Sequence, residues 1–255
     1  MGTMLQSYGM KGGELAEGYN LNKPEIIAKI HRAFRDAGAD VITTNTFGAS
    51  RGKLADTGLE LTAVITAAVE IARQAAPDQL IALDIGPLGQ LMEPYGSLSF
   101  EAAYEGFREQ ISVGAAAGAD LILIETMSDV YEAKAAILAA REHSSLPIVC
   151  TMTFQADGRT LTGTDPVTMV NILQSLGVAA LGLNCSLGPK EMLPLVREVL
   201  GYAQVPVIVQ PNAGLPQIVN GETVFKISPA EFAANGREMA TAGVSILGGC
   251  CGTTP

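Results

Sequence analysis

Two adjacent cysteines near the end of the chain are the residues best suited to chemistry. Cys250 and Cys251 stand side by side in GGCCGTTP, residues 248–255, although the chain has only four cysteines. A disulfide between neighbours is disfavoured, because consecutive Cα atoms lie only about 3.8 Å apart, below the usual disulfide range. Four cysteines in 255 residues are also too few for a secreted disulfide framework. Free thiolates for metal binding or catalysis are the alternative.

Length and charge limit the classes of protein that these cysteines can serve. A chain of 255 residues with 16 basic and 26 acidic side chains has a net charge of -10. That charge, with no local Lys/Arg cluster, argues against nucleic acid or an anionic membrane as partner. No apolar run approaches the length of a membrane span, and the N-terminal residues lack a signal-peptide pattern. We expect one cytoplasmic domain over residues 1–255.

Strand-like and helix-like segments alternate along the chain. Short apolar stretches suited to buried parallel strands occur at residues 40–46, 80–86, 120–126, 147–154, 179–185, 206–212 and 244–250. Helical spacing of apolar residues occurs at 23–38, 61–76, 99–118, 129–142 and 190–203. Repeated βα units build either a barrel or a doubly wound sheet, and no G-x-G-x-x-G turn follows a strand. The pattern predicts an α/β fold of the TIM (β/α)8 barrel type.

Glycines and the strand count refine this prediction. Gly38, Gly118, Gly177 and Gly243 each stand where a helix is expected to end, as left-handed caps before the next strand. Seven strands do not close an eight-stranded barrel. We therefore expect the first strand to end around residues 1–5, with most of it before Met1, and the last helix to be missing as well.

Chemistry in a barrel of this type sits at the carboxyl ends of the strands. Polar residues at these predicted ends are Thr43, Thr44, Asn45, Thr46, Asp84, Glu125, Thr126, Asn184, Cys185, Ser186, Gln210, Asn212, Cys250 and Cys251. Three of the four cysteines are thus expected at one rim. Three thiolates with no fourth protein ligand are typical of an open zinc site that takes water or substrate. Gly248, Gly249 and Gly252 would let the backbone turn sharply around the cysteine pair.

Less specific roles account for several other residues. Cys150 lies in the middle of a predicted strand and is interpreted as a small apolar core residue. Asp129 and Asp165 are predicted helix N-caps, and single asparagines after strands are often turn formers. His31 falls in a predicted helix and His143 near the end of one, so we do not expect them to complete the zinc site. Glu125 ends an apolar strand, so it is either paired structurally or holds a cationic substrate group.

Several motifs together resemble a known family. They are TNTFGAS (44–50), IGPLG (85–89), ETMSD (125–129), GRTLTGTDP (158–166), GLNCSLGP (182–189), QPNAGLP (210–216) and GGCCGTTP (248–255). The chain resembles the homocysteine S-methyltransferase family over essentially its whole length, most nearly the homocysteine-binding barrel of cobalamin-dependent methionine synthase. The separated NC and GGCC elements are specific, whereas IGPLG or TNTF alone would be weak.

The resemblance implies a zinc ion held by Cys185, Cys250 and Cys251, with the sulfur of homocysteine as the added ligand and methionine as the product. It implies that Glu125 holds the homocysteine amino group. Substrate contacts are further expected around Thr44 and Asn45 and at Asn212, Ala213 and Gly214. The family's Asp-Gly-Ala, which usually precedes MGTM, is absent here.

No D-x-H-x-x-G cobalamin loop is present, so the methyl donor is expected to come from elsewhere. The resemblance implies that it is methylcobalamin on another domain or on a corrinoid protein. The alternatives are a free-standing methyltransferase that uses S-methylmethionine or a betaine, and a non-catalytic module that binds homocysteine and zinc.

Overall fold

Each of the seven apolar stretches contains a strand in the computed structural model of the protein, which describes residues 1–219 and 222–255. The chain divides into two compact units. The first comprises Met1–Glu125, Tyr131–Ile148 and Thr254–Pro255, and the second comprises Thr126–Val130 and Val149–Thr253. Each unit is described by itself.

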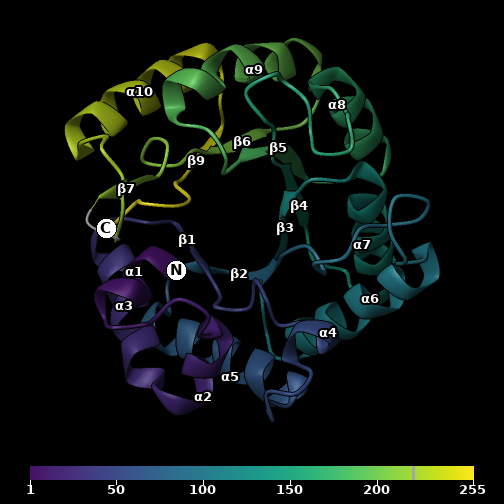
Figure 1. Ribbon diagram of the computed structural model, residues 1–255, viewed down its shortest axis with the longest axis vertical. Coiled ribbons are helices and arrows are strands. Elements are labelled where there is room, and N and C mark those ends of the chain that lie inside the picture. The colour runs from purple at the N-terminus through teal and green to yellow at the C-terminus, as the bar shows by residue number, and fades with distance from the viewer. Residues whose placement is uncertain (220–221) are drawn as a thin grey trace. The chain divides into compact units, whose positions relative to one another are not determined.

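The first unit alternates helices with parallel strands. Its elements are α1 (Gly2–Ser7), the 3-10 helix η1 (Ala16–Gly18), α2 (Tyr19–Asn22), α3 (Pro24–Asp36), β1 (Val41–Thr43), α4 (Arg51–Leu54), α5 (Leu61–Ala75), β2 (Leu80–Ile85), α6 (Phe100–Ala116), most of β3 (Leu121–Met127) and most of α7 (Val130–His143). Strand β2 pairs in parallel with β1 on one side and with β3 on the other. Helix α5 packs against both α3 and α6, and α3 lies against β1, whereas α5 and α6 lie against β2 (Figure 1).

The core of the first unit follows from the apolar faces of these helices. Val64, Ile65 and Ala68 of α5 are fully buried, and so are Phe107 and Ile111 of α6. Burying a large aliphatic or aromatic side chain contributes about 1.5–3 kcal/mol. This layer of helices therefore fixes the strands whose carboxyl ends carry the polar residues.

The second unit repeats the pattern. It contains most of β4 (Ile148–Met152), α8 (Pro166–Ser175), β5 (Ala180–Asn184), α9 (Pro189–Tyr202), β6 (Val207–Gln210), the antiparallel pair β7 (Gln217–Val219) and β8 (Glu222–Val224), α10 (Pro229–Ala242) and β9 (Ile246–Leu247). Strands β4, β5, β6 and β9 are parallel neighbours in that order. Helices α8, α9 and α10 lie side by side in Figure 1.

The predicted α/β alternation is confirmed, and the seven apolar stretches are strands with parallel neighbours. Six of the seven strands are shorter than predicted, most clearly at residues 244–250, of which only Ile246 and Leu247 form a strand. Strand β3 has the predicted length but is shifted by one residue. The four predicted glycine caps are also confirmed, since Gly38, Gly118, Gly177 and Gly243 all have positive φ. Closure as an eight-stranded barrel stays a prediction.

The prediction that a strand ends around residues 1–5 is wrong. Residues Gly2–Ser7 form helix α1. The physical reason is the spacing of its apolar residues: Leu5 is fully buried in a cluster with Tyr19, Ile27 and Ile30, and Met1 and Met4 pack against the same cluster. Apolar positions three and four residues apart share one face of a helix, which a strand could not present to this core.

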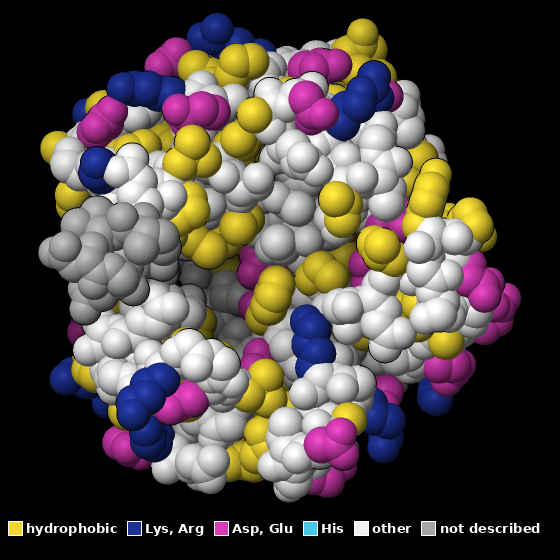
Figure 2. All heavy atoms as spheres, in the orientation of Figure 1, with side chains coloured by type: hydrophobic (Ala, Val, Ile, Leu, Met, Phe, Trp, Pro, Cys, Tyr) yellow, Lys and Arg dark blue, Asp and Glu magenta, His cyan; other side chains and the backbone are white. Residues whose placement is uncertain are grey.

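The surface agrees with the expectation from composition. On the face drawn in Figure 2, basic side chains are scattered among acidic and apolar ones and form no continuous basic area. In the part of the chain that the structure describes, no helix has the length and apolar character needed to span a membrane.

Candidate metal centre

The three cysteines singled out from the sequence converge in the second unit. The sulfur atoms of Cys185, Cys250 and Cys251 all lie within 4.8 Å of one another, and those of Cys185 and Cys251 are 3.9 Å apart. Cys185 and Cys250 are half-buried and Cys251 is exposed, so a further ligand has access. The fourth cysteine, Cys150, is fully buried in β4 and is not part of the cluster, as expected.

The distances fit a tetrahedral metal ion. With metal–sulfur bonds of about 2.3 Å, two sulfurs of a tetrahedral zinc site lie about 3.8 Å apart. The separation of 3.9 Å between Cys185 and Cys251 meets this requirement without rearrangement of the backbone. An all-sulfur donor set favours Zn²⁺ over the hard cations Mg²⁺ and Ca²⁺. The three thiols therefore suit a zinc ion with one position left for another ligand.

Cys185 is presented by an unusual turn at the end of β5. Cys185 and Ser186 both have positive φ, 60° and 61°, a conformation that costs non-glycine residues free energy. The Cys185 N–H donates to the Gln210 carbonyl over 3.0 Å, and the Leu187 N–H donates back to the Cys185 carbonyl over 2.7 Å. Backbone bonds thus hold the strained turn that aims the thiol at the other two cysteines. Strained non-glycine residues of this kind cluster at functional sites.

Cys250 and Cys251 lie in a loop that follows β9. The Cys250 N–H donates to the Pro211 carbonyl over 2.9 Å, and the Thr253 hydroxyl donates to the Cys250 carbonyl over 2.7 Å. Of the three glycines expected to let the backbone turn around the cysteine pair, Gly252 has a left-handed φ of 80°. Gly249 serves a different need, because a Cβ there would come within 2.5 Å of the Thr253 side chain.

Asn212 and Ala213 hold the cysteine loop from the end of β6. The Cys251 N–H donates to Asn212 Oδ1 over 3.0 Å, and the Ala213 N–H donates to the Cys251 carbonyl over 2.9 Å. Asn212 is buried. Asn212 and Ala213, which are predicted substrate contacts, therefore both form hydrogen bonds with the candidate metal ligand Cys251. Gly214, the third, has φ of +96°, and a Cβ there would come within 3.1 Å of the Ile227 side chain.

The thiols polarise one another. Hydrogen bonds from Cys250 and then Cys251 lower the pKa of Cys185 well below the usual thiol range, against the opposing effect of burial. The hydrogen bond to Cys185 in turn raises the pKa of Cys251. One thiolate shared among three sulfurs is the arrangement that a soft cation stabilises further.

The residues expected near the substrate in the first unit are tightly engaged. Asn45 is buried and donates both amide hydrogens, to the Ala16 carbonyl over 2.7 Å and to Asn20 Oδ1 over 2.9 Å. The hydroxyl of Thr44 accepts from the Asp84 N–H over 3.0 Å and pairs with the Thr46 hydroxyl over 2.7 Å. Their side chains therefore organise the strand ends.

Two carboxylates lie on the neighbouring strands β2 and β3. Glu125 is half-buried, whereas Asp84 is 6% exposed. Burial and the nearby charge of Glu125 raise the pKa of Asp84 well above its usual range. The sequence shows Asp84 only as a polar residue at a strand end and suggests no role for it. A signal was nevertheless present: like Glu125, it is a lone carboxylate in an apolar strand.

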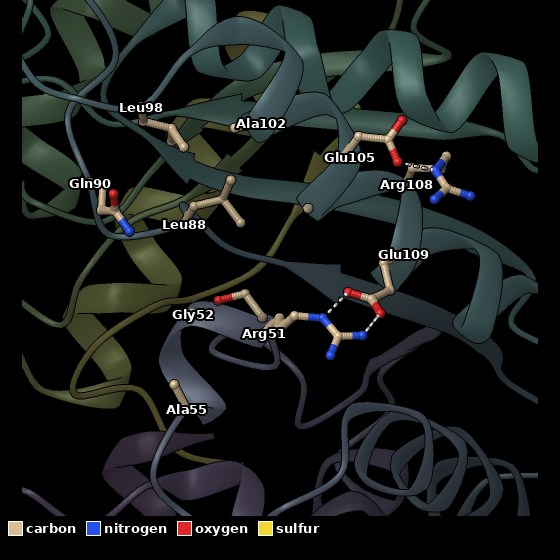
Figure 3. A pocket seen from close by; sticks show the side chains of 12 residues that line it. Arg51, Gly52, Ala55, Leu88, Gln90, Leu98, Ala102, Glu105, Arg108 and Glu109 are labelled. Carbon is tan, nitrogen blue, oxygen red and sulfur yellow. Dashed lines mark hydrogen bonds and ion pairs between the residues drawn. The ribbon is translucent and has the colours of Figure 1, made fainter.

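A separate hollow of about 610 Å³ opens in the first unit between α4, α6 and the segment after β2 (Figure 3). Arg51 of α4 and Glu109 of α6 form a two-pronged ion pair along it, and Arg108 pairs with Glu105 over 2.7 Å. No cysteine and neither Asp84 nor Glu125 lines this hollow. It is therefore distinct from the groups that the sequence marks for chemistry.

The histidines do not join the cluster. His31 lies within α3 and is buried, and His143 ends α7, where its Nε2 is 2.9 Å from the Tyr104 hydroxyl. The prediction that Asp165 caps a helix is confirmed, since its side chain accepts from the Thr168 N–H at the start of α8. Asp129 directly precedes α7 and is buried, and its capping role stays a prediction.

The α/β fold and the thiol cluster at its strand ends define a protein with a candidate thiolate metal site. Comparisons place it more narrowly. A model of the homocysteine S-methyltransferase family matches residues 1–255. The chain belongs to this family.

Individual relatives agree. The chain is 32% identical to methionine synthase of Mycobacterium leprae over 279 residues and 32% identical to that of Mycobacterium tuberculosis over 278. All of this chain is covered in both cases, but it spans only 23% of the length of these relatives. Among solved structures, the metallated form of the homocysteine methyltransferase MmuM from Escherichia coli is 25% identical, with a TM-score of 0.84. That match covers 100% of this chain and 90% of MmuM.

Proposed function

We propose that the chain is a zinc-dependent homocysteine S-methyltransferase that converts homocysteine to methionine. The observation that carries the proposal is the convergence of Cys185, Cys250 and Cys251, whose sulfurs lie within 4.8 Å of one another in a member of this family. Zinc would be held by these three residues. A zinc ion bound there would deprotonate a coordinating thiol and hold it ready for attack on a methyl group.

The protein's own groups set the properties of this centre. The Cys251 N–H bond to Asn212 Oδ1 and the Ala213 N–H bond to the Cys251 carbonyl fix the loop that carries two of the sulfurs. Three cysteine ligands place negative charge around the fourth position. A substrate sulfur bound beside these three thiolates would keep more electron density than among neutral ligands, which would favour its reaction with an electrophilic methyl carbon.

The amino-acid part of the substrate needs its own contacts. We assign the ammonium group to Glu125, because the family resemblance implies this role for its carboxylate, which is half-buried near the end of an apolar strand. Backbone groups at Thr44 and Asn45 and the segment Asn212, Ala213 and Gly214 are the further proposed contacts. The side chains of Thr44, Asn45 and Asn212 already have hydrogen-bond partners, so any contact from the first two would come from the main chain.

The methyl donor is proposed to be methylcobalamin carried by another domain or by a corrinoid protein. The support is the 32% identity to methionine synthases, whose length exceeds this chain about fourfold at 23% coverage. In the transfer, the homocysteine sulfur forms the new bond to carbon with its own electron pair. The donor keeps the electron pair of the broken bond, and the thiol proton leaves to solvent. The 90% coverage of MmuM favours, as a second candidate, a small donor that binds directly.

A donor screen tests both candidates. Zinc-loaded protein is incubated with homocysteine and, in separate reactions, with methylcobalamin, S-methylmethionine or glycine betaine, and methionine is measured by mass spectrometry. We expect methionine from methylcobalamin, and none when Cys185 is replaced by serine. If methionine forms only from S-methylmethionine or betaine, the methyl donor is a small molecule that binds directly and not methylcobalamin. Tight homocysteine binding without product from any donor would indicate a binding module.

A further inference from the structure

Asp84 is a buried carboxylate with one oxygen that has no hydrogen-bond partner among the described residues. The residue is 6% exposed, and the oxygen without a partner is Oδ1. Its backbone, by contrast, is fully held: the Asp84 N–H donates to Thr44 Oγ1 over 3.0 Å, and its carbonyl accepts from the Thr46 hydroxyl over 2.7 Å. A buried carboxylate without a partner is strongly unfavourable. The backbone bonds thus hold Asp84 in place, while its Oδ1 stays without a hydrogen bond.

The register of the strands puts a second carboxylate on the same face. Asp84 of β2 is aligned with Leu123 of β3, and Glu125 lies two residues further along β3. Alternate residues of a strand face the same side, so Asp84 and Glu125 share a face, with Cα atoms about 8 Å apart from strand spacing and rise. That separation leaves room for one small cation between the two side chains.

Other charged groups near Asp84 do not replace such a cation. Glu17 adds a further negative charge, and Lys53 and the Met1 amino group contribute positive ones. Lys53 is already engaged, because its Nζ donates to the Pro87 carbonyl over 2.6 Å and lies 5.2 Å from the centre of the Phe47 ring. Burial and then Glu125 outweigh the positive groups and raise the pKa of Asp84. A cation bound beside Asp84 would offset both the cost of burying its charge and the repulsion from Glu125.

We propose that Asp84 is a second carboxylate for the α-ammonium group of the amino-acid substrate, acting together with Glu125. The inference rests on the proposed function, which supplies homocysteine as the substrate. An ammonium group has three N–H donors and no acceptor, so it can bridge two carboxylates and still bond a carbonyl. Two carboxylates select for the amino acid over a thiol that lacks the amine, because the amine-free thiol leaves them repelling each other.

The test compares two thiols that differ only in the amine. Binding of homocysteine and of 4-mercaptobutanoate to the zinc-loaded protein is measured by calorimetry for the wild type and for Asp84→Asn. We expect homocysteine affinity to fall by about tenfold or more, the worth of a charge-assisted hydrogen bond. The affinity for 4-mercaptobutanoate and the zinc content stay unchanged. Asp84→Ala carries the same prediction if the amide disturbs the strand.

Stability separates a binding role from a structural one. Since Asp84 Oδ1 has no hydrogen bond to lose, we expect Asp84→Asn to leave the melting temperature unchanged or to raise it. The matched control is Asp120→Asn, because Asp120 Oδ2 accepts from Arg73 over 2.6 Å and from the Ile81 N–H over 2.7 Å. That control lowers the melting temperature and leaves homocysteine affinity unchanged.

Equal affinities of wild type and Asp84→Asn for homocysteine, or an equal loss for both thiols, would overturn the role of Asp84. Failure of the wild type to bind either thiol would instead overturn the proposed function, and the inference with it.

Discussion

Asn184 binds Thr126 through both ends of its side-chain amide. Its Oδ1 accepts from the Thr126 N–H over 2.8 Å, and its Nδ2 donates to the Thr126 hydroxyl over 2.7 Å. The same Oδ1 also accepts from the Thr151 hydroxyl over 2.8 Å. Asn184 is fully buried, and Thr126 has a φ of +61°. The residue before the zinc-ligand candidate Cys185 therefore holds the residue after Glu125 in a left-handed conformation.

Replacement of Asn184 by alanine should remove the hydrogen bonds that hold Thr126 in its left-handed conformation. It should also leave the Thr126 N–H and the hydroxyls of Thr126 and Thr151 without their Asn184 partner. We expect the free energy of unfolding to fall by about 2–4 kcal/mol from lost buried hydrogen bonds. In a Thr126→Gly background the same replacement should cost about 1 kcal/mol less, because glycine adopts positive φ without strain. Urea unfolding of the four proteins of this double-mutant cycle measures the coupling. Strictly additive losses would show that the two residues are independent.

Cys250→Ser should abolish zinc retention while the far-ultraviolet circular dichroism stays nearly unchanged. The sulfur lies on an irregular loop, so its loss removes a metal ligand without disturbing a helix or strand. The measurement is metal analysis after dialysis. The control is Cys150→Ala, which removes a buried thiol outside the cluster and should keep both zinc and activity. Stoichiometric zinc in Cys250→Ser would exclude this residue from the site.

Glu125→Gln should weaken homocysteine binding with zinc content intact. The amide keeps the size of the side chain but removes the charge proposed to hold the ammonium group, worth about 1.5–3 kcal/mol for a charge-assisted bond. Calorimetric titration of the zinc-loaded variant gives the affinity. Unchanged affinity would assign Glu125 a purely structural role.

His31 should make the fold sensitive to acid. Burial, and less strongly the charge of the Met1 amino group, lower the pKa of His31 from 6.5 to about 4. As the pH falls, His31 is therefore protonated near pH 6.5 in the unfolded chain but only near pH 4 in the folded chain. The contribution of His31 to the free energy of unfolding is therefore constant above pH 6.5 and falls by about 3 kcal/mol as the pH decreases from 6.5 to about 4.

The check is urea unfolding at a series of pH values for the wild type and for His31→Leu. The variant should lose the decline between pH 6.5 and about 4 that this residue causes. His143→Gln is the matched control, since His143 is exposed at the end of α7 and should leave the decline in place. Identical acid profiles for wild type and His31→Leu would contradict the argument.

The strands and the cysteine cluster could be predicted from the sequence for one physical reason. Buried parallel strands require continuous apolar runs, and their carboxyl ends meet at one edge. Polar residues that directly follow such runs, such as Cys185, Asn212 and Cys251, are thereby brought near one another however far apart they lie in the chain. The glycine caps could also be predicted from the sequence, because only glycine readily ends a helix with positive φ.

Other features depend on packing that no local pattern encodes. Residues 2–7 form a helix because Leu5 packs into a buried apolar cluster, and their intrinsic helix propensity does not predict it. The double contact of Asn184 with Thr126 joins the ends of β5 and β3, which are not neighbours in the sheet, so Asn184 could not be told from a turn-forming asparagine. Asp84 can be recognised in the sequence as a strand-end carboxylate, but only the structure shows that its Oδ1 has no hydrogen-bond partner among the described residues.

The most direct test of the zinc-thiolate account is the metal content of the purified protein, combined with zinc-edge X-ray absorption before and after addition of homocysteine. The account predicts about one zinc ion with three sulfur neighbours from Cys185, Cys250 and Cys251, rising to about four with the substrate thiol. Absence of zinc from protein supplied with the metal, or a sulfur count that homocysteine does not change, would contradict it.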